Sequence, residues 1–375
     1  MKKGLYKNIL KGLPLCAVIL LCAVPAGCSV TEPEPEPRRV TLVAVGDNLL
    51  HMPIIRWCAT ADGYDFTPLY REVKELVLGA DMAFVNQESP LGGEGFATSG
   101  YPLFNSPREA GEALADTGFN VINQANNHAL DKGEEALLAT ADFWQGVPGV
   151  TAIGINRNEE ERYSVAVLEA HGCRFAWLSY SYGVNGMPMP QGYLLDLIDE
   201  AAMAGDIARA RDLADAVIVS LHWGGEYQPA PDPKQRELAQ FLADQGVILV
   251  IGHHPHVPQP LEWLEGKDGR STLVMFSLGN FVSGQSRREA MLGGMLSVVF
   301  LAGEDGVVIE DCGVIPLVTH YERGYREYCV YPLYNYTEDL ARRHYINQWG
   351  RPVSADYFSG LAYEAWGEYC ITKSR

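Results

Sequence analysis

Five short apolar runs are each followed within three residues by an acid, an amide or an imidazole, and this pattern restricts the fold more than any other feature. The runs have strand length and are rich in β-branched residues. In an open α/β sheet, ligands bind at the carboxyl ends of the parallel strands. We therefore expect the following polar residues to meet at one edge: Asp47, Glu88, Asn126, Asn127, His128, His222, His254 and His256.

The order of the predicted elements indicates a mixed system, with two sheets and helices outside them. Helical spacing ending at glycine predicts helices over residues 107–118, 133–146 and 233–246. Strands are predicted at 39–47, 81–88, 119–128, 215–223, 247–254 and 271–281, with a hairpin over 164–181 that turns at His171–Gly172. Residues 291–316 predict two or three antiparallel strands, and residues 320–375 predict a C-terminal extension with helical character.

The first 28 residues have the composition of a secretion signal. Four lysines and no acid precede an apolar stretch that is shorter than the ~20 residues of a membrane-spanning helix. The ending at Cys28 resembles a bacterial lipoprotein signal, in which this cysteine is lipidated, although Pro25 stands where such signals usually have leucine. An uncleaved membrane anchor is the alternative. Either interpretation predicts an extracytoplasmic protein anchored to the cell membrane, with residues 29–38 as a Pro/Glu-rich linker.

Charge and cysteine content exclude two classes of function. The net charge of −18 repels nucleic acid, so no nucleic-acid partner is expected, and an anionic substrate would need local cations such as metal ions. Beyond the signal there are five cysteines, an odd number without C-x-x-C spacing, which argues against a cysteine-zinc site or a disulfide framework. One or two disulfides stay open, and Cys312 and Cys329 are nearest in sequence.

Each polar residue taken alone has an interpretation that needs no metal. An aspartate after a strand commonly caps a helix. An Asn-Asn-His segment usually makes local side-chain to backbone bonds. The segment "HHPH" is more specific, because Pro255 restricts the backbone between His254 and His256 and lets two imidazoles project from one turn. The combination of all five strand ends favours a metal site.

Six of these residues form a ligand set of oxygen and nitrogen atoms without sulfur: Asp47, Glu88, Asn127, His222, His254 and His256. Such a set suits divalent Mn, Fe, Zn or Mg. Six ligands are too many for one tetrahedral ion but suit two ions that share a carboxylate. Two ions about 3.5–4 Å apart activate water and stabilise both the attacking and the leaving oxygen of a hydrolytic displacement. The sequence therefore predicts two divalent metal ions.

Five segments of the chain resemble the successive motifs of the CapA family, which acts in poly-γ-glutamate capsule synthesis. They are VAVGDNLLH, FVNQESPLG, NQANNHALDKG, the stretch from SLHWGGEY to GHHPHVPQPLE, and FSLGNFV, in this order between about Val40 and Val282. The family is similar to metallophosphoesterases in fold. The resemblance therefore implies an α/β protein with a four-layer α/β/β/α sandwich like that of metallo-dependent phosphatases, here over residues 39–319.

The resemblance also implies roles for the metal ligands. Asp47 is expected to bind one ion, His222 the second, and Glu88 to bridge the two. Asn127 matches an amide ligand, and His254 and His256 are expected to bind one ion each. His253 should point the other way, toward the rim or the neighbouring layer. His51 is a further candidate ligand, although it lies four residues after Asp47 where metallophosphoesterases usually have a spacing of two.

Other motif residues are expected around the ions. The resemblance implies that His128 stabilises or protonates the leaving group, and Asp131 is placed to orient it. Asn126 and Glu226 are expected to support the ligands or to contact substrate.

The chain departs from the phosphoesterase pattern, since it lacks Asp-x-His, has Glu88 as the bridging acid and has Asn126 in place of the usual glycine. These departures leave the chemistry open between phosphoester and γ-glutamyl amide or ester substrates. We expect a metal-dependent hydrolase of capsule or exopolymer assembly, with an anionic polymer as partner. The alternative is a non-catalytic, polymer-binding scaffold subunit that joins membrane subunits for capsule synthesis or export and holds structural metals. A soluble cytosolic phosphatase fits the motifs but not the N-terminus.

Overall fold

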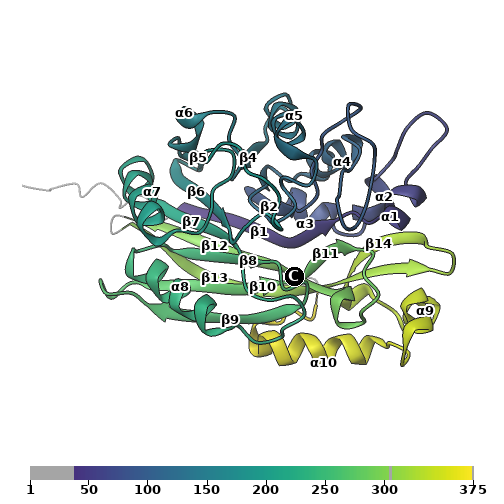
Figure 1. Cartoon of the computed structure of the whole chain (residues 1–375). Coiled ribbons are helices and arrows are strands. Elements are labelled where there is room, and N and C mark those ends of the chain that lie inside the picture. Colours follow the sequence, from purple (N-terminus) through teal and green to yellow (C-terminus); the bar gives the residue numbers. More distant parts are fainter. Residues whose placement is uncertain (1–37, 304–305, 374–375) are drawn as a thin grey trace, which may run out of the picture. The chain divides into compact units, whose positions relative to one another are not determined.

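Two mixed sheets pack face to face and carry helices on their outer faces (Figure 1). The computed structural model describes residues 38–303 and 306–373. The predicted signal, Cys28 and the linker up to residue 37 lie outside the described residues. Pro37–Arg375 forms one compact unit.

The first sheet has eight strands, and its parallel half ends at the predicted site. β1 pairs in parallel with both β2 and β11, and β3 and β4 extend the parallel part. β12, β13 and β14 continue the sheet on the other side in antiparallel pairing. The bounds are β1 Arg38–Leu49, β2 Met82–Gln87, β3 Val121–Asn123, β4 Thr151–Ile153, β11 Asn280–Ser283, β12 Leu292–Gly303, β13 Gly306–Glu322 and β14 Arg326–Pro332.

The second sheet has six strands in the order β5-β6-β7-β8-β10-β9. Its four central strands are parallel, and β5 and β9 are antiparallel edges. The predicted hairpin at His171–Gly172 is confirmed as β5 and β6. The bounds are β5 Ala166–Ala170, β6 Cys173–Ser181, β7 Ala216–His222, β8 Leu249–His253, β9 Pro258–Glu265 and β10 Ser271–Leu278.

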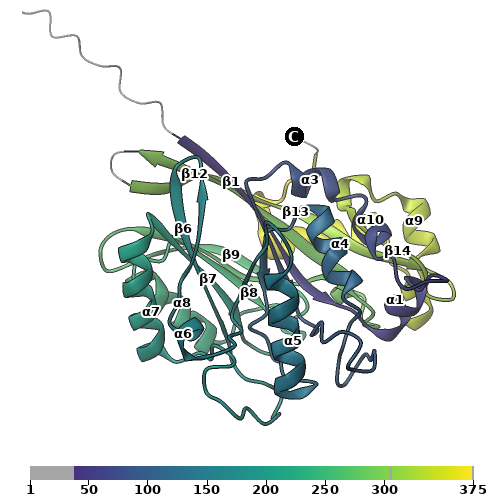
Figure 2. The same ribbon diagram turned by 90° about the horizontal axis from the view of Figure 1, so that it is seen from above.

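The helices complete four layers (Figure 2). Apolar side chains of α1–α5 share one core with the first sheet and the inner face of the second, while α7 and α8 pack on the outer face of the second sheet. The α-helices are α1 Met52–Trp57, α2 Thr67–Tyr70, α3 Lys74–Leu78, α4 Glu109–Thr117, α5 Gly133–Gln145, α6 Glu159–Arg162, α7 Glu200–Leu213, α8 Pro233–Asp244, α9 Glu338–Arg343 and α10 Ala355–Trp366. Short 3₁₀ helices are η1 Glu289–Met291, η2 Leu333–Asn335, η3 Tyr345–Trp349 and η4 Gly367–Tyr369.

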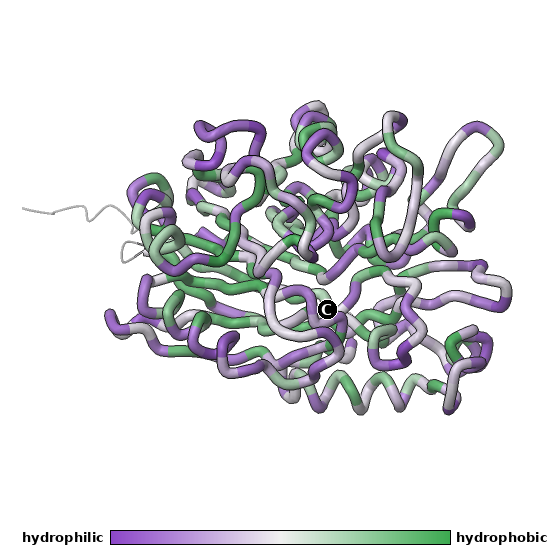
Figure 3. The backbone as a smooth tube through the Cα atoms, viewed as in Figure 1, coloured by the Kyte–Doolittle hydropathy of each residue, from purple (hydrophilic) through white to green (hydrophobic). Residues whose placement is uncertain are grey.

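Alternation along the strands of the second sheet explains its two covered faces. Ile218 on β7 and Leu249 on β8 face the first sheet, whereas Val217, Val219 and Val250 pack against α7 and α8. Successive strand side chains point to opposite faces, so apolar residues at every position require burial on both sides. Figure 3 shows the hydrophobic residues gathered along these strands and the hydrophilic ones along the outer loops and helices.

The predicted boundary at residue 319 is wrong, because it falls inside β13. β13 continues to Glu322, β14 then pairs with it, and α10 packs against β9, β12 and β13. The buried Trp366 on α10 donates its indole N–H to the Gln259 carbonyl on β9 at 3.0 Å. The last described residues therefore belong to the same unit as the rest of the fold, and their helical character is confirmed in α9 and α10.

Two expectations about membranes and disulfides can be compared with the described residues. Within residues 38–303 and 306–373, no helix combines the length and the apolar character that crossing a bilayer requires. The five cysteines beyond the signal are all free thiols, so Cys312 and Cys329 do not pair.

Candidate metal centre

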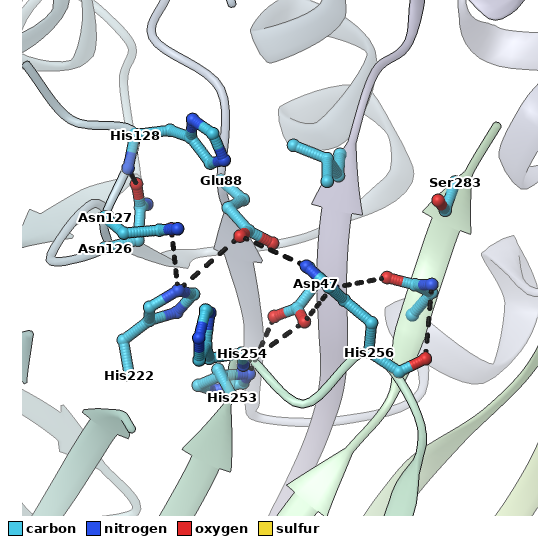
Figure 4. Close-up of polar contacts among 12 residues, drawn as sticks. Asp47, Glu88, Asn126, Asn127, His128, His222, His253, His254, His256 and Ser283 are labelled. Carbon is cyan, nitrogen blue, oxygen red and sulfur yellow. Dashed lines mark hydrogen bonds and ion pairs between the residues drawn. The ribbon is translucent and has the colours of Figure 1, made fainter. Parts of the chain in front are cut away.

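The polar residues that follow the five apolar runs meet at one place between the two sheets (Figure 4). β1, β2 and β3 deliver Asp47, Glu88 and the segment Asn126–His128 from the first sheet. β7 and β8 deliver His222 and the turn after His253 from the second sheet. The carboxyl ends of parallel strands from both sheets therefore build one site, as the sequence predicts.

The turn at His254-Pro255-His256 has a backbone that side chains other than glycine rarely adopt. His254 has φ 95° and His256 has φ 59°, both in the left-handed region. Such conformations persist where surrounding contacts hold them, and they are common at functional sites. Here the His254 N–H donates to Asp47 at 3.3 Å, and the Pro255 carbonyl accepts from Tyr227 N–H at 2.7 Å. This backbone conformation directs both imidazoles toward the carboxylates.

Asp47 lies at a close approach between two strand ends. A Cβ at Gly46 would lie 1.9 Å from the Gly279 carbonyl oxygen, so only glycine allows the Asp47 N–H to bond that oxygen at 3.0 Å. The side chain of Asp47 accepts from Asn86 at 2.7 Å and faces His256 Nδ1 at 3.0 Å. The backbone thus fixes this carboxylate in the middle of the site.

Glu88 is fully buried, and neither of its carboxylate oxygens has a hydrogen-bond partner among the described residues. A buried carboxylate without partners is costly unless a cation or proton occupies its place. Glu88 Oε1 lies 3.5 Å from His222 Nε2 and 3.8 Å from His256 Nε2. Glu88 also belongs to two groups with metal-ligand spacing, Glu88–His222–His254 and Asp47–Glu88–His256. The residues therefore fit two ions that share Glu88.

Asn127 adds an oxygen to the first group. Its Oδ1 lies 2.9 Å from His222 Nε2, and its amide donates to Asn185 Oδ1 at 3.2 Å. Two ligands of one ion, each about 2.1 Å from it, lie roughly 3 Å apart. This spacing would suit one shared ion, and the ligand role of Asn127 stays a prediction.

Burial and mutual charge perturb this cluster strongly. Burial opposes ionisation of Asp47, but hydrogen bonds from His253 and His256 hold the pKa of this carboxyl well below its usual range. Burial and the Asp47 charge raise the pKa of Glu88 well above its usual range. Burial disfavours the charged form of His256, but the Glu88 and Asp47 carboxylates raise its pKa to about 9. Burial lowers the pKa of His254 to about 3. A proton held within this cluster thus offsets the negative charge of its carboxylates. Bound divalent cations would displace that proton.

His128 is held at the edge of the site by Asp131. Its Nδ1 lies 2.7 Å from Asp131 Oδ2, as the spacing of three residues predicts. The ring of Phe104 meets His128 edge-on at 4.7 Å, and the Phe104 N–H donates to the same Asp131 oxygen at 2.7 Å. Asn126 accepts from the His128 N–H and donates to the Gln87 carbonyl, so it fixes this loop. These contacts do not engage Nε2 of His128, so this nitrogen can act in the site.

Two candidates lie outside both ligand groups. His51 accepts the Gly284 N–H at its Nδ1 and packs against Phe104 at 5.2 Å. Glu226 is exposed, and its charge contributes to raising the pKa of both Glu88 and His256. Glu226 therefore lies at the rim of the site.

His253 points toward the neighbouring layer, one of the two directions predicted for it, and it also lies near Asp47. Its ring stacks on Phe84 of the facing sheet at 5.4 Å, and its Nδ1 lies 3.5 Å from Asp47 Oδ1. The ring therefore contacts the first sheet and also lies close to the Asp47 carboxylate. His253 belongs to neither ligand group.

Three residues of the site carry no role in the sequence-based prediction. Asn86 and Asn280 hold Asp47 and His256, the latter through an Oδ1 to Nδ1 distance of 3.1 Å. Tyr182 covers His254 at 4.7 Å between ring centroids. The two asparagines lie within the motifs FVNQESPLG and FSLGNFV, and this position could have indicated a role in the site. No motif in the sequence pointed to Tyr182.

A family comparison assigns this site to a known group. Residues 41–285 match the model of the bacterial capsule synthesis protein PGA_cap, which is more than half of the chain. The chain belongs to this family. The match covers all five strand ends that build the site and confirms the resemblance in the motifs. The chain is thus a member of the CapA-type proteins of capsule and poly-γ-glutamate biosynthesis.

Two relatives named CapA agree with this assignment. The chain is 26% identical to the PGA biosynthesis protein CapA of Bacillus subtilis over 296 residues, 76% of this chain and 74% of that protein. It is 28% identical to the capsule biosynthesis protein CapA of Bacillus anthracis over 290 residues, 73% and 67% of the two chains. Among solved structures, a novel phosphatase from Mycoplasma pneumoniae is similar at 14% identity and a TM-score of 0.47, covering 75% of this chain and 94% of that one. A calcineurin-like phosphoesterase from Bacillus subtilis is similar at 12% identity and a TM-score of 0.42, covering 75% and 90%.

Proposed function

We propose that this capsule-family protein is a membrane-anchored, extracytoplasmic hydrolase that uses two divalent ions on an anionic exopolymer or a precursor of it. The observation that carries the proposal is Glu88, a fully buried carboxylate that two ligand groups share and that has no hydrogen-bond partner within the described part of the chain. Bound cations would balance the charge of such a buried carboxylate and supply the partners that its oxygens lack.

The ligand groups name the residues that would hold each ion. Glu88, His222, His254 and the Asn127 oxygen would hold one, and Asp47, Glu88 and His256 the other. Asn86 and Asn280 keep Asp47 and His256 in place through their amides. When bound, paired divalent ions lower the pKa of water and stabilise developing negative charge on oxygen.

His128 is the residue placed for proton transfer. Asp131 engages Nδ1, so it fixes the ring and leaves Nε2 to hold a proton for the departing group. The surrounding contacts exclude most water, since His128 is 6% exposed and Phe104 is buried. A site that only bound structural ions would not require an oriented histidine outside the ligand groups.

Family membership and charge both support an anionic polymer as the substrate. Relatives are named for capsule and poly-γ-glutamate biosynthesis, which favours a polymer rich in carboxylates. The chain carries a net charge of −18, so such a polymer would be attracted only at a local cationic point. The ions supply one such point, and Arg287 supplies another, lying 4.2 Å from the Tyr227 ring that faces His256.

The decisive experiment combines metal analysis with a substrate screen on residues 29–375. We expect two transition-metal equivalents per chain in the wild type and a loss of both in Glu88→Gln, because this carboxylate serves both groups. Among phosphoesters and γ-glutamyl peptides, at least one substrate should turn over, and His128→Ala should abolish turnover without removing metal.

Two results would contradict the proposal. Protein that retains no transition metal after purification with added Mn²⁺ or Zn²⁺ would exclude the ion site. Two bound ions with no turnover on the panel, and thermal stability lost in the ligand variants alone, would favour the polymer-binding scaffold instead.

A further inference from the structure

A cavity of about 280 Å³ lies beside the candidate metal centre, between the start of β9 and the helix α10 (Figure 1). Its apolar walls are Tyr227, Val257, Pro258, Leu361 and Ala365. The ring of Tyr227 lies 6.1 Å from the ring of His256. The Tyr227 N–H donates to the Pro255 carbonyl at 2.7 Å, which attaches this wall to the turn that carries His256. The cavity and the candidate metal centre therefore share a wall.

Three charged side chains of both signs border the cavity: Arg287, Glu289 and Glu364. Arg287 is exposed, and its guanidinium lies 4.2 Å from the centroid of the Tyr227 ring, which holds it beside the cavity. Within residues 38–303 and 306–373, neither Arg287 nor the exposed Glu364 forms a side-chain hydrogen bond or an ion pair. Glu289 accepts from the Tyr357 hydroxyl at 3.0 Å through Oε1. The cavity thus has an accessible arginine and an accessible glutamate that do not pair with each other.

Separated charges of opposite sign suit a ligand that carries both. An α-amino acid group has an ammonium and a carboxylate on one carbon, so it can bind an arginine and a glutamate at the same time. The apolar walls would cover its methylene groups. A ligand with carboxylates alone would satisfy Arg287 but would be repelled by Glu289 and Glu364. The charges around the cavity therefore favour a zwitterion over a pure anion.

A γ-linked glutamyl chain carries an α-amino acid group only at its amino-terminal residue. Every later residue uses its nitrogen in the amide bond and keeps only the α-carboxylate. The ring distances of 4.2 Å and 6.1 Å limit the separation of Arg287 and His256 to about 10 Å, and one extended γ-glutamyl residue spans about 6 Å. A terminal residue in the cavity would therefore place the first or second amide bond of its chain at the metal centre.

We propose that this cavity binds the amino-terminal α-amino acid group of a γ-glutamyl chain, with Arg287 on the α-carboxylate and Glu364 on the α-ammonium. The choice of a γ-glutamyl chain and the placement of its amide bond at the metal centre rest on the proposed function. The binding of the chain end needs no metal ion. The protein would then act near the amino end of a chain, and internal segments would bind the cavity more weakly.

Calorimetric titration of metal-free protein tests the binding step without metal-dependent cleavage. The probes are a γ-glutamyl tripeptide, in its all-L and all-D forms, and the same tripeptides with an acetylated amino terminus. Acetylation removes the ammonium charge, so the wild type should bind the acetylated form of its preferred isomer about tenfold more weakly. Arg287→Gln should bind the free tripeptide about tenfold more weakly. Glu364→Gln should lose the preference for the free amino terminus.

Two nearby residues provide matched controls. Arg288→Gln removes the same charge as Arg287→Gln, but the Arg288 guanidinium lies 4.6 Å from the Tyr357 ring centroid and donates to the Arg351 carbonyl at 3.2 Å. Glu368→Gln removes an exposed acid that follows α10 and does not border the cavity. Both control variants should bind the tripeptides as the wild type does.

Three results would overturn the site: no binding of the tripeptide, equal affinity for the free and acetylated forms of both isomers, or a loss of binding in Arg288→Gln as large as in Arg287→Gln. Metal content and turnover of the same proteins separate this proposal from the proposed function. A preference for the free amino terminus in a protein that takes up no metal would support the cavity while the hydrolase proposal fails. Full metal binding and turnover without that preference would overturn the cavity alone.

Discussion

At the scale of single residues, three neighbouring histidines have three different surroundings. His254 and His256 face the carboxylates from a strained turn, whereas His253 lies beneath Asp47 and stacks on Phe84. Side chains alternate along an extended strand, but the turn at Pro255 breaks that alternation. Residues that are adjacent in sequence therefore contact different parts of the site.

This asymmetry predicts different outcomes for two alanine variants. His254→Ala should lose one metal equivalent, since it removes a ligand of one ion only. His253→Ala should keep both equivalents but lower the free energy of unfolding by about 2–3 kcal/mol, because it empties a fully buried position. Elemental analysis and denaturant unfolding measure both effects. Loss of metal in His253→Ala with stability unchanged would contradict the assignment.

A second prediction concerns His344, which is buried far along the chain from the ligands. Burial lowers its pKa to about 4, against backbone hydrogen bonds that favour the charged form. The unfolded chain binds this proton with a pKa near 6.5, so stability is lost as pH falls from about 6.5 to 4. The loss should be on the order of 3 kcal/mol.

Urea unfolding across this pH range measures the effect. His344→Gln should flatten the dependence, while the metal-site histidines contribute equally to both proteins. A wild type and variant with parallel pH profiles would show that His344 does not charge on unfolding.

At the scale of elements, α10 closes the fold from the far end of the chain. It packs on β9, β12 and β13, and its Trp366 leaves no room for a side chain at Gly294, where a Cβ would lie 2.8 Å from the ring. The helix is amphipathic, with Phe358, Ala362 and Trp366 buried on one face. The C-terminal segment is thus part of the core.

The packing of α10 predicts that a substitution on its buried face destabilises the protein much more than one on its exposed face. Trp366→Ala should destabilise the protein by about 3–5 kcal/mol, because it leaves a cavity and an unsatisfied Gln259 carbonyl. Tyr363→Ala on the exposed face, where Tyr363 is 70% exposed, should change stability by less than about 0.5 kcal/mol. Thermal unfolding distinguishes the two. Equal effects would show that α10 does not pack as described.

At the scale of the whole molecule, the proposed location depends on the first 28 residues, which lie outside the described residues. A lipid at Cys28 would tether the domain outside the cytoplasm, where an exopolymer is assembled. Cys28→Ser should abolish incorporation of a labelled fatty acid and move the protein from the membrane fraction to the soluble one. Fractionation of cells with both forms tests this. Equal membrane association without fatty-acid label would favour an uncleaved anchor.

The sequence by itself determined which polar residues follow the strands, and it predicted which of them would bind metal. Strand character and a polar residue directly after it are local, so Asp47, Glu88, His222 and the His254–His256 turn could be identified along the chain. The hairpin at His171–Gly172 was predictable for the same reason. The family motifs then ordered these residues into one site.

Only the tertiary structure decided how these ends meet and what supports them. The pairing of β11 with β1 brings Asn280 beside His256, and the facing of two sheets brings His253 under Asp47. The boundary at residue 319 was wrong because β13 and α10 gain their stability from distant strands, which leaves no local signal. Contacts between residues far apart in sequence arise from packing, and no local pattern encodes them.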